Sequence, residues 1–485
     1  MKSIALFVSL LLTAAVGTAQ NVVLIKGGTV LTVTRGTLEN TDILIRDGKI
    51  AQIGRDLAAP PGAQVIDARG KYIMPGIIDA HSHMAIDNVN ESTNPVTAEV
   101  RIRDVVNPYE INIYRALAGG VTTIHSMHGS ANVIGGQPVT MKLRYGEPVE
   151  RMIVQDAPRT IKFALGENPT RVHGRASQGQ FGGGRASVNP STRMGVEQVM
   201  RKAFEMARQY MAQWDAYEKA RQAWERNRRR GPEPVPPRKD ERLETLAAIL
   251  RGEVIVHCHS YRADEILMVL RVFRDFGIKR LVFQHVLEGY KVARELAEFG
   301  AMASTFSDWW AYKFEVYYAT PYNAAIMHSY GVNVSLNSDS DELVRRLYHE
   351  AAKAVRYGGV PEDAALAMIT INPAKQIGLD HRIGSIEVGK DADLAIFNAH
   401  PLSVYAVCEM TLVDGVVRFD RSRDPDDMRL VVDPDESIED AYVQFNPADY
   451  DRCMLGAEEH EGVWMGGVEL FGLVEEFLAQ KEDGR

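Results

Sequence analysis

Cysteine is scarce in this chain of 485 residues, which contains only Cys258, Cys408 and Cys453. Three cysteines are too few for a disulfide framework, although the sequence leaves a Cys408–Cys453 disulfide open. The chain also lacks a late apolar run long enough to span a membrane. Its net charge of −9 lacks the basic excess with which proteins bind nucleic acid. We therefore expect neither a nucleic-acid partner nor a membrane span in the mature chain.

The first residues have the pattern of a secretory signal. Lys2 precedes an apolar stretch at residues 4–16, and small residues follow at 17–19. This apolar stretch is too short to cross a bilayer comfortably. We expect residues 1–19 to be a signal peptide and the mature chain to be exported, either periplasmic or secreted.

Short strands are expected near both ends of the chain. Residues 20–75 and 385–420 are rich in β-branched residues, and each contains an Asp-Gly pair between two such runs, Asp47-Gly48 and Asp414-Gly415. An Asp-Gly pair between hydrophobic runs indicates a tight hairpin. The two segments together predict one small β-sandwich domain formed from both chain ends. Residues 421–485 predict an acidic extension with a terminal helix.

The middle of the chain, residues 76–384, alternates strand and helix patterns. Helical periodicity is clear at 196–228, 263–276 and 291–299. The expected strands lie at 77–80, 121–126, 160–165, 254–258, 280–284, 302–306 and 332–336. Such alternation predicts a parallel sheet, and its length fits an α/β fold of the closed (β/α)8 TIM barrel type. An open doubly wound sheet is the competing fold, which the missing glycine fingerprint after the first strand disfavours.

Three segments of the middle region have an unusual composition. Residues 174–194 are rich in Gly and Arg and predict either a mobile lid at the strand ends or a plain connector. Aromatic residues at 309–318 either line a pocket or only pack. The basic run at 228–230 lies between a charged helical stretch and a Pro-rich loop. We interpret this run as the solvated end of a helix.

Histidines gather where the predicted strands end. His81 and His83 follow the first strand two residues apart, so both side chains point to the same side of the pleat. Neutral imidazoles placed in this way can bind one divalent metal together. His257, His285 and Asp339 lie at the ends of later strands, where barrel enzymes carry their chemistry. This series of ligand types predicts a metal site.

Longer motifs surround these histidines. They are Pro75-Gly76-Ile77-Ile78-Asp79-Ala80-His81-Ser82-His83, Gly120-Val121-Thr122-Thr123, residues 129–137, residues 161–169, Asn372-Pro373-Ala374 and residues 384–394. In these motifs the chain resembles the amidohydrolase superfamily, and within it the exported imidazolonepropionase-related and Xaa-Pro-dipeptidase-like members. The resemblance covers residues 21 to about 420. It implies a metal-dependent hydrolase with a barrel and a split β-sandwich, and it does not specify the substrate.

The resemblance also implies the roles of individual residues. His81 and His83 would bind a first divalent metal ion, with zinc as the expected metal. His257 and His285 would bind a second ion. Asp339 would bind metal and move protons as the catalytic residue.

A bridging ligand between two metal ions is expected from the fourth strand. The resemblance places Lys162, as a carboxylated lysine, at this position, and Glu167 is its rival. Strand alternation puts residues 162 and 167 on opposite faces, so only one of them should point inward; we favour Lys162. His128 and His259 are expected to contact the substrate or to support the ligands.

The expected reaction follows from these ligands. A divalent metal lowers the pKa of bound water, and Asp339 would take its proton and pass it to the leaving nitrogen. This predicts hydrolysis of an amide, peptide or cyclic amide in a small-molecule or peptide substrate. A deaminase or a ring-opening imidazolonepropionase-type enzyme is the alternative, because His285 and Glu288 have a spacing that deaminases use. A non-catalytic metal-binding barrel is the third hypothesis, and a homo-oligomer is left open.

Overall fold

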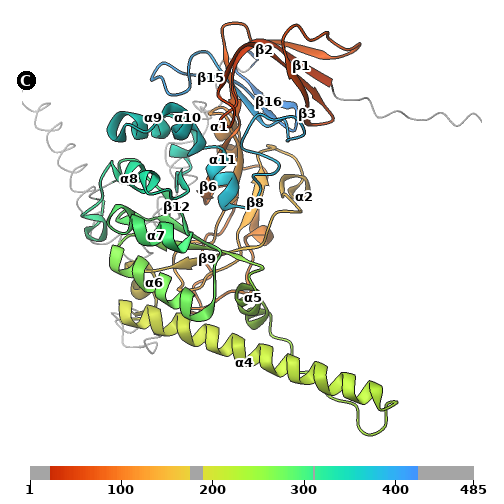
Figure 1. Ribbon diagram of the computed structural model, residues 1–485, viewed down its shortest axis with the longest axis vertical. Coiled ribbons are helices and arrows are strands. Elements are labelled where there is room, and N and C mark those ends of the chain that lie inside the picture. The colour runs from red at the N-terminus through yellow and green to blue at the C-terminus, as the bar shows by residue number, and fades with distance from the viewer. Residues whose placement is uncertain (1–21, 175–188, 310–311, 424–485) are drawn as a thin grey trace, which may run out of the picture.

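The computed structural model describes residues 22–174, 189–309 and 312–423 (Figure 1). The predicted signal peptide, most of the Gly- and Arg-rich segment, Cys453 and the extension beyond residue 423 lie outside the described residues. Within the described part of the chain, no helix is both long enough and apolar enough to cross a membrane. Cys258 and Cys408 are both buried free thiols.

Both ends of the described chain contribute to one mixed β-sheet, seen at the top of Figure 1. Its strands are β1 Val22–Leu31, β2 Thr37–Arg46, β3 Lys49–Gly54, β4 Gln64–Asp67, β5 Tyr72–Pro75, β14 Leu394–Phe397, β15 Cys408–Val413 and β16 Val416–Asp420. The pairing of β5 with β14 joins the two chain ends. The Asp-Gly hairpins are confirmed, because both residues of each turn have positive φ, 50° and 77° in the first and 49° and 70° in the second.

The strands of this predicted β-sandwich domain form one continuous sheet. The long central strand β1 pairs with β2 along one edge and with β4 and then β5 along the other. Register shifts between Ile25 and Val30 bend this strand. The bent sheet therefore encloses its own core, built around Ile25, Ile43 and Leu394.

Two further sheets form the middle of the molecule. The first is β6 Ile77–Ser82, β7 Val121–Ser126 and β8 Val139–Lys142, and the second is β9 Thr160–Ala164, β10 Ile255–Ser260, β11 Leu281–His285, β12 Met302–Thr305 and β13 Val334–Leu336. All strands of the second sheet are parallel, as are β6 and β7. The α/β prediction is therefore correct at the level of its parallel strands.

The described strands do not close into the predicted eight-stranded barrel. β8 runs antiparallel to β7, so it cannot take the place of a parallel barrel strand. A few backbone hydrogen bonds outside the sheet ladders link the two sheets instead. Gly135 N–H donates to Lys162 O at 2.7 Å, Lys162 N–H donates to Gly136 O at 3.0 Å, and Asp339 N–H donates to His81 O at 3.2 Å. These bonds still bring the ends of the parallel strands to one face.

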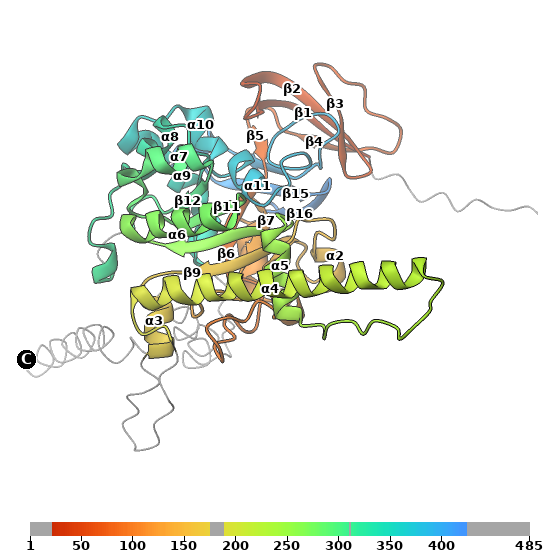
Figure 2. The ribbon, with the colours of Figure 1, turned by 60° about the horizontal axis from the view of Figure 1, so that its bottom comes forward.

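Helices flank the parallel sheet. They are α1 Ile111–Leu117, α2 Val149–Met152, α3 Glu167–Gly174, α4 Arg193–Arg226, α5 Glu241–Leu250, α6 Ala263–Phe276, α7 Ala293–Phe299, α8 Asn323–Ser329, α9 Leu347–Gly358, α10 Glu362–Ala367 and α11 Ile371–Gln376. The bounds of α6 match its periodicity, and Gly277 with φ 74° ends it. Phe204 of α4 and Phe273 of α6 pack on Phe163 of β9, and Figure 2 shows both helices beside this sheet.

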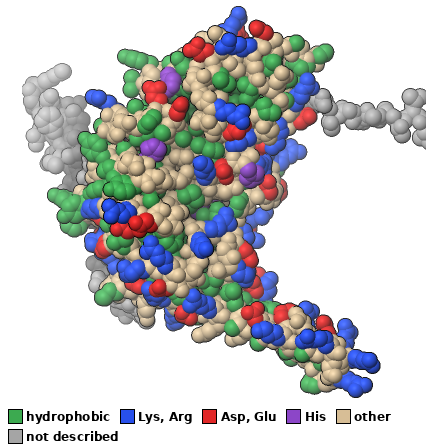
Figure 3. All heavy atoms as spheres, in the orientation of Figure 1, with side chains coloured by type: hydrophobic (Ala, Val, Ile, Leu, Met, Phe, Trp, Pro, Cys, Tyr) green, Lys and Arg blue, Asp and Glu red, His purple; other side chains and the backbone are tan. Residues whose placement is uncertain are grey.

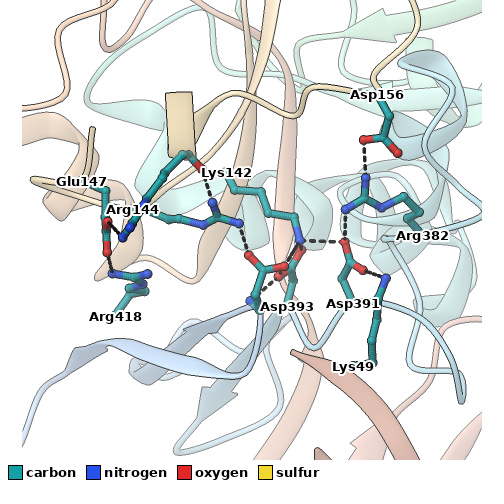
Figure 4. Close-up of polar contacts among 11 residues, drawn as sticks. Lys49, Lys142, Arg144, Glu147, Asp156, Arg382, Asp391, Asp393 and Arg418 are labelled. Atoms are coloured by element: carbon teal, nitrogen blue, oxygen red, sulfur yellow. Dashed lines mark hydrogen bonds and ion pairs between the residues drawn. The ribbon is translucent and has the colours of Figure 1, made fainter. Parts of the chain in front are cut away.

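A buried lysine joins the β-sheet domain to the α/β part (Figure 4). Lys142, at the end of β8, has a side chain that is 2% exposed, and its Nζ lies 2.7 Å from Asp391 and 3.0 Å from Asp393. It also contacts Asp414 in the β15–β16 hairpin. Burial alone would lower the pKa of Lys142, but the three carboxylates raise it overall. The lysine therefore stays charged and is balanced by residues of the other domain.

Candidate metal centre

Three side chains predicted as ligands converge at the ends of β6 and β13. His81 Nε2 lies 3.3 Å from His83 Nε2. Asp339 Oδ1 lies 3.3 Å from the Nε2 of His81 and 3.1 Å from that of His83. These three atoms all lie within 4.8 Å of one another. His81 and Asp339 are buried, whereas 9% of the His83 side chain reaches solvent.

Hydrogen bonds on the far side of each imidazole fix its orientation. His81 Nδ1 donates to the side-chain oxygen of Gln284 at 3.1 Å, and His83 Nδ1 donates to Met127 O at 2.8 Å. With Nδ1 protonated, each Nε2 presents a lone pair toward the other imidazole and toward Asp339. Lone pairs and a carboxylate at this separation repel one another unless positive charge lies among them, and the Lys162 ammonium, 3.1 Å from His81 Nε2, supplies such a charge in the described chain. The donor set therefore fits a divalent metal.

Lys162 and Glu167, the two rival bridging residues, lie in different places. Lys162 is fully buried, and its Nζ donates to His81 Nε2 at 3.1 Å. Glu167 does not continue strand β9 but begins helix α3, where it pairs with Arg171 at 3.0 Å. The structure thus brings Lys162 to the ligand cluster and leaves Glu167 in an ion pair at the helix start.

His257 and His259, the two histidines of β10, each lie in the surroundings that the sequence predicted for the other. His257 receives a hydrogen bond from Gln284 Nε2 at 2.9 Å, and its ring lies 4.9 Å from that of His125. His259 instead lies 4.7 Å from the ring of His285, and neither of its ring nitrogens has a hydrogen-bond partner among the described residues. His285 Nε2 is 3.6 Å from Asp339 Oδ2. The position next to His285 is therefore held by His259 and not by His257.

Burial keeps these histidines neutral. It is the largest cause that lowers the pKa of His81, His257 and His259 well below the usual value, and it lowers that of His285 to about 3. Burial alone would raise the pKa of Asp339, but its interactions with His285 and His83 and the charge of Lys162 lower it overall. Neutral imidazoles and an ionised carboxylate are the protonation states that bind a divalent metal.

Asp79 holds the two ligand-bearing segments together. Its carboxylate accepts hydrogen bonds from His81 N at 3.1 Å and from the Ser338 hydroxyl. Burial raises the pKa of Asp79 to about 7. The neighbouring residues His285 and Asp339 have positive φ values of 67° and 46°, which is costly for residues other than glycine. A strained backbone fixed by a buried carboxylate is typical of a functional site.

His128 does not present a free nitrogen to a substrate. Its Nδ1 donates to Gly129 O at 2.9 Å, and its Nε2 accepts from Glu91 N at 2.8 Å. Both ring nitrogens are therefore used to hold backbone segments. A substrate could therefore reach His128 only by displacing one of these backbone bonds, and the predicted substrate contact stays a prediction.

We expect His128 to make the protein sensitive to acid. Burial lowers its pKa to about 4, whereas the unfolded chain binds this proton near pH 6.5. Between these values the unfolded state holds more protons, so stability falls as pH decreases, by up to about 1.4 kcal/mol per pH unit. Urea unfolding with a chelator at pH 7 and pH 5 should show a smaller loss in His128→Asn than in the parent. The exposed control His381→Asn should keep the parent's loss, and equal losses in all three proteins would contradict the expectation.

An aromatic wall lies beside the ligand cluster. Phe306 stacks on His285 with ring centroids 4.9 Å apart, and Trp309 stacks on Phe306 at 4.6 Å. Tyr317 and Tyr318 point outward instead and are 69% and 61% exposed. Phe306 and Trp309 therefore shield the site. Trp310 lies outside the described residues.

Comparisons with known proteins identify relatives of this chain. The Amidohydrolase family profile matches residues 322–419. A crystal structure of an amidohydrolase from Thermotoga maritima MSB8 is 35% identical with a TM-score of 0.73, covering 82% of this chain and 100% of that chain. This chain belongs to the amidohydrolase family. It is accordingly an enzyme, a hydrolase.

Two other relatives of this amidohydrolase are either longer than this chain or match only a part of it. The amidohydrolase tasK of Hapsidospora irregularis is 31% identical over 405 residues, which make up 78% of this chain and 40% of tasK. A dihydroorotase of Geobacter sulfurreducens is 35% identical over 117 residues, 24% of each chain. The chain thus spans well under two thirds of the length of these two relatives.

Gln284 is the residue of this amidohydrolase site that the sequence analysis missed. Its amide oxygen accepts from His81 while its amide nitrogen donates to His257, so it sets the orientation of both rings. Glutamine is not a typical metal ligand, so a search for ligand types passes over it. Its place directly before His285 at a strand end was the available signal.

Proposed function

We propose that this amidohydrolase cleaves a carbon–nitrogen bond of an amide, peptide or cyclic amide with the help of one or two divalent metal ions, with zinc as the expected metal. The observation that carries the proposal is the convergence of His81 Nε2, His83 Nε2 and Asp339 Oδ1 at 3.1 to 3.3 Å. The family membership of the chain supports hydrolysis as the reaction.

The residues around the site would have different roles in this hydrolysis. A bound metal ion supplies a Lewis acid and an acidified water. His81 and His83 would hold it, with Nε2 aimed inward by Gln284 and Met127. The ionised Asp339 would accept a proton from the attacking water and deliver it to the leaving nitrogen. The buried Phe306 and the partly buried Trp309 would keep bulk water from this exchange.

Lys162 is proposed as the bridging residue in its carboxylated form. Its Nζ lies 3.1 Å from His81 Nε2 in a fully buried position, so a carboxylate formed on this nitrogen would lie among the ligand atoms. Its Glu167 rival is proposed to be structural, because it pairs with Arg171.

We expect His259 to matter more than His257 for a second metal ion. His259 lies beside His285 with both ring nitrogens lacking a partner among the described residues. Gln284 donates to Nδ1 of His257, so this neutral ring carries its proton on Nε2 and has no free lone pair for a metal. His259→Asn should lower the metal content by about one ion per chain, and the matched His257→Asn should keep it. Elemental analysis after dialysis measures both. The reverse result would restore His257 as the ligand.

The deaminase alternative loses support at Glu288. This residue would be the acid of a deaminase-type pair with His285, but its carboxylate accepts from Ala263 N at 2.8 Å and pairs with Lys291 at 3.0 Å. Ring opening keeps more support, because the matched relatives include a dihydroorotase and a D-hydantoinase, whose names refer to cyclic amides. The preference between linear and cyclic amides is therefore left to the assay.

The proposed function is tested by amine release from dipeptides and N-acyl amino acids, with and without a chelator. We expect release that the chelator abolishes and that added zinc restores. Activity only on cyclic amides, followed by ring opening in the ultraviolet, would select the ring-opening reaction. Release that is unaffected by the chelator would contradict a metal-dependent mechanism.

A further inference from the structure

The second half of α4 leaves the body of the protein. The buried side chains of this helix are all in its first part: Val196, Met200, Ala203, Phe204, Ala207 and Tyr210. Beyond them the helix and the loop that follows it extend away from the body (Figures 1 and 2). A helix without a core contact is costly to maintain in water, so this half needs a role other than packing.

Positive charge is concentrated at the end of this projecting helix. We call residues 219–230 the arm tip; six of its twelve residues are Lys or Arg and one is acidic. Every side chain of the arm tip is exposed except the half-buried Trp224. Figure 3 shows these basic groups gathered at the outer end of the arm.

The charges of the arm tip are largely unpaired within the described chain. Arg221 pairs with Glu218, and Arg229 lies over the Trp224 ring at 5.7 Å. No ion pair with another described residue holds the four remaining basic side chains, Lys219, Arg226, Arg228 and Arg230. Arg228 and Arg229 also have positive φ values of 53° and 59°, a conformation that costs about 1 kcal/mol or more for each non-glycine residue. The exposed arginine turn is therefore held in an unfavourable backbone conformation.

The opposite charge lies in the last part of the sequence. Residues 424–485 contain eighteen acidic and four basic residues, whereas the first 423 residues contain 51 basic and 46 acidic residues. The negative net charge of the protein therefore comes entirely from this acidic segment. Its 62 residues can span up to about 200 Å when extended, enough to reach the arm tip from Arg423.

We propose that the arm tip binds the acidic segment 424–485. The attraction is between a compact group of guanidinium ions and a long polyanion, so it should be strong at low salt and screened at high salt. An occupied arm tip would also explain why its arginines are held in a turn with so little contact to the body. This proposal is independent of the metal centre.

Zero-length carbodiimide cross-linking of the full chain tests the proposal, because it joins a carboxylate to a lysine only where they touch. We expect mass spectrometry to find links between carboxylates of 424–485 and Lys219 at low salt. These links should disappear in 1 M salt, where the screening length is about 3 Å. Replacing Arg226, Arg228, Arg229 and Arg230 together by Gln keeps Lys219 and should lower its links at least about fivefold.

A charge-matched variant distinguishes the effect of the arm tip on cross-linking from the effect of the net charge. It replaces four exposed arginines elsewhere by Gln, namely Arg55, Arg103, Arg294 and Arg356, and it should keep the links to Lys219. Far-ultraviolet circular dichroism checks that both variants are folded. The proposal is overturned if Lys219 stays unlinked while the acidic segment couples to other lysines, as it would if the arm served another anionic partner. Equal link yields in the parent and the arm-tip variant would also overturn it.

Discussion

Replacing Asp339 by Asn should lower kcat by about 10²- to 10⁴-fold, the usual contribution of a positioned proton carrier. The amide of Asn cannot accept the proton of the attacking water, so the leaving nitrogen would go unprotonated. His81 and His83 still offer two nitrogen ligands whose far sides are fixed by Gln284 and Met127. We therefore expect the first metal ion to stay bound.

The measurement pairs turnover with metal content for the same preparation. Asp363→Asn, the same chemical change on the exposed face of α10, should leave both unchanged. Loss of metal together with activity would make Asp339 chiefly a ligand. Turnover within tenfold of the parent would remove it from the proton-transfer role.

Replacing Lys142 by Met should destabilise the protein by about 3 to 5 kcal/mol, the usual cost of breaking a buried ion pair. The loss arises because Asp393 would stay buried without its ammonium partner, while Asp391 would keep only Lys49 and Arg382. Burial alone would raise the pKa of Asp391, but Lys142 and other cations lower it to about 2. Its contribution is thus present at neutral pH and is lost only as pH falls from the unfolded value toward 2.

Lys49 supplies a matched control for this prediction. It contacts the same Asp391, but 48% of its side chain is exposed, and pairs with an exposed partner contribute about 0 to 1 kcal/mol. Urea unfolding of Lys49→Met should therefore differ little from the parent. Similar losses in the two variants would show that burial at the domain junction does not decide the strength of this contact.

Where local geometry is enough, the sequence predicts which side chains come together. His81 and His83 were found because two residues of spacing on a strand dictate one face. His257 and His259 also share a face, so only depth along the strand distinguishes them. β10 runs to Ser260, two residues beyond the predicted end at 258, and Ser260 pairs with His285, so His259 lies closer to the level of His285 than His257 does. Strand ends are the least certain part of such a prediction.

The differences between the predicted and the observed fold also arise where local sequence is not enough. Hairpins are local, and both Asp-Gly turns are as predicted. The four-residue strand β8 is too short to give a periodic signal, and its antiparallel direction depends on distant contacts. Residues 162 and 167 would lie on opposite faces only if the strand continued past Ala164. Gly166 with φ 74° ends this strand, and α3 begins at Glu167. Sheet closure and strand direction are properties of the whole chain and not of a window of residues.

The pairing of β5 with β14 has a consequence for the order in which the protein is made. On the ribosome, β5 is complete at Pro75, but its neighbour begins only at Leu394. At translation rates of 5–20 residues per second, the edge of β5 waits roughly 15 to 60 seconds for its partner. An open apolar edge is a template for pairing with other chains. We therefore expect the newly made chain to depend on chaperones during this interval, long before any metal is bound.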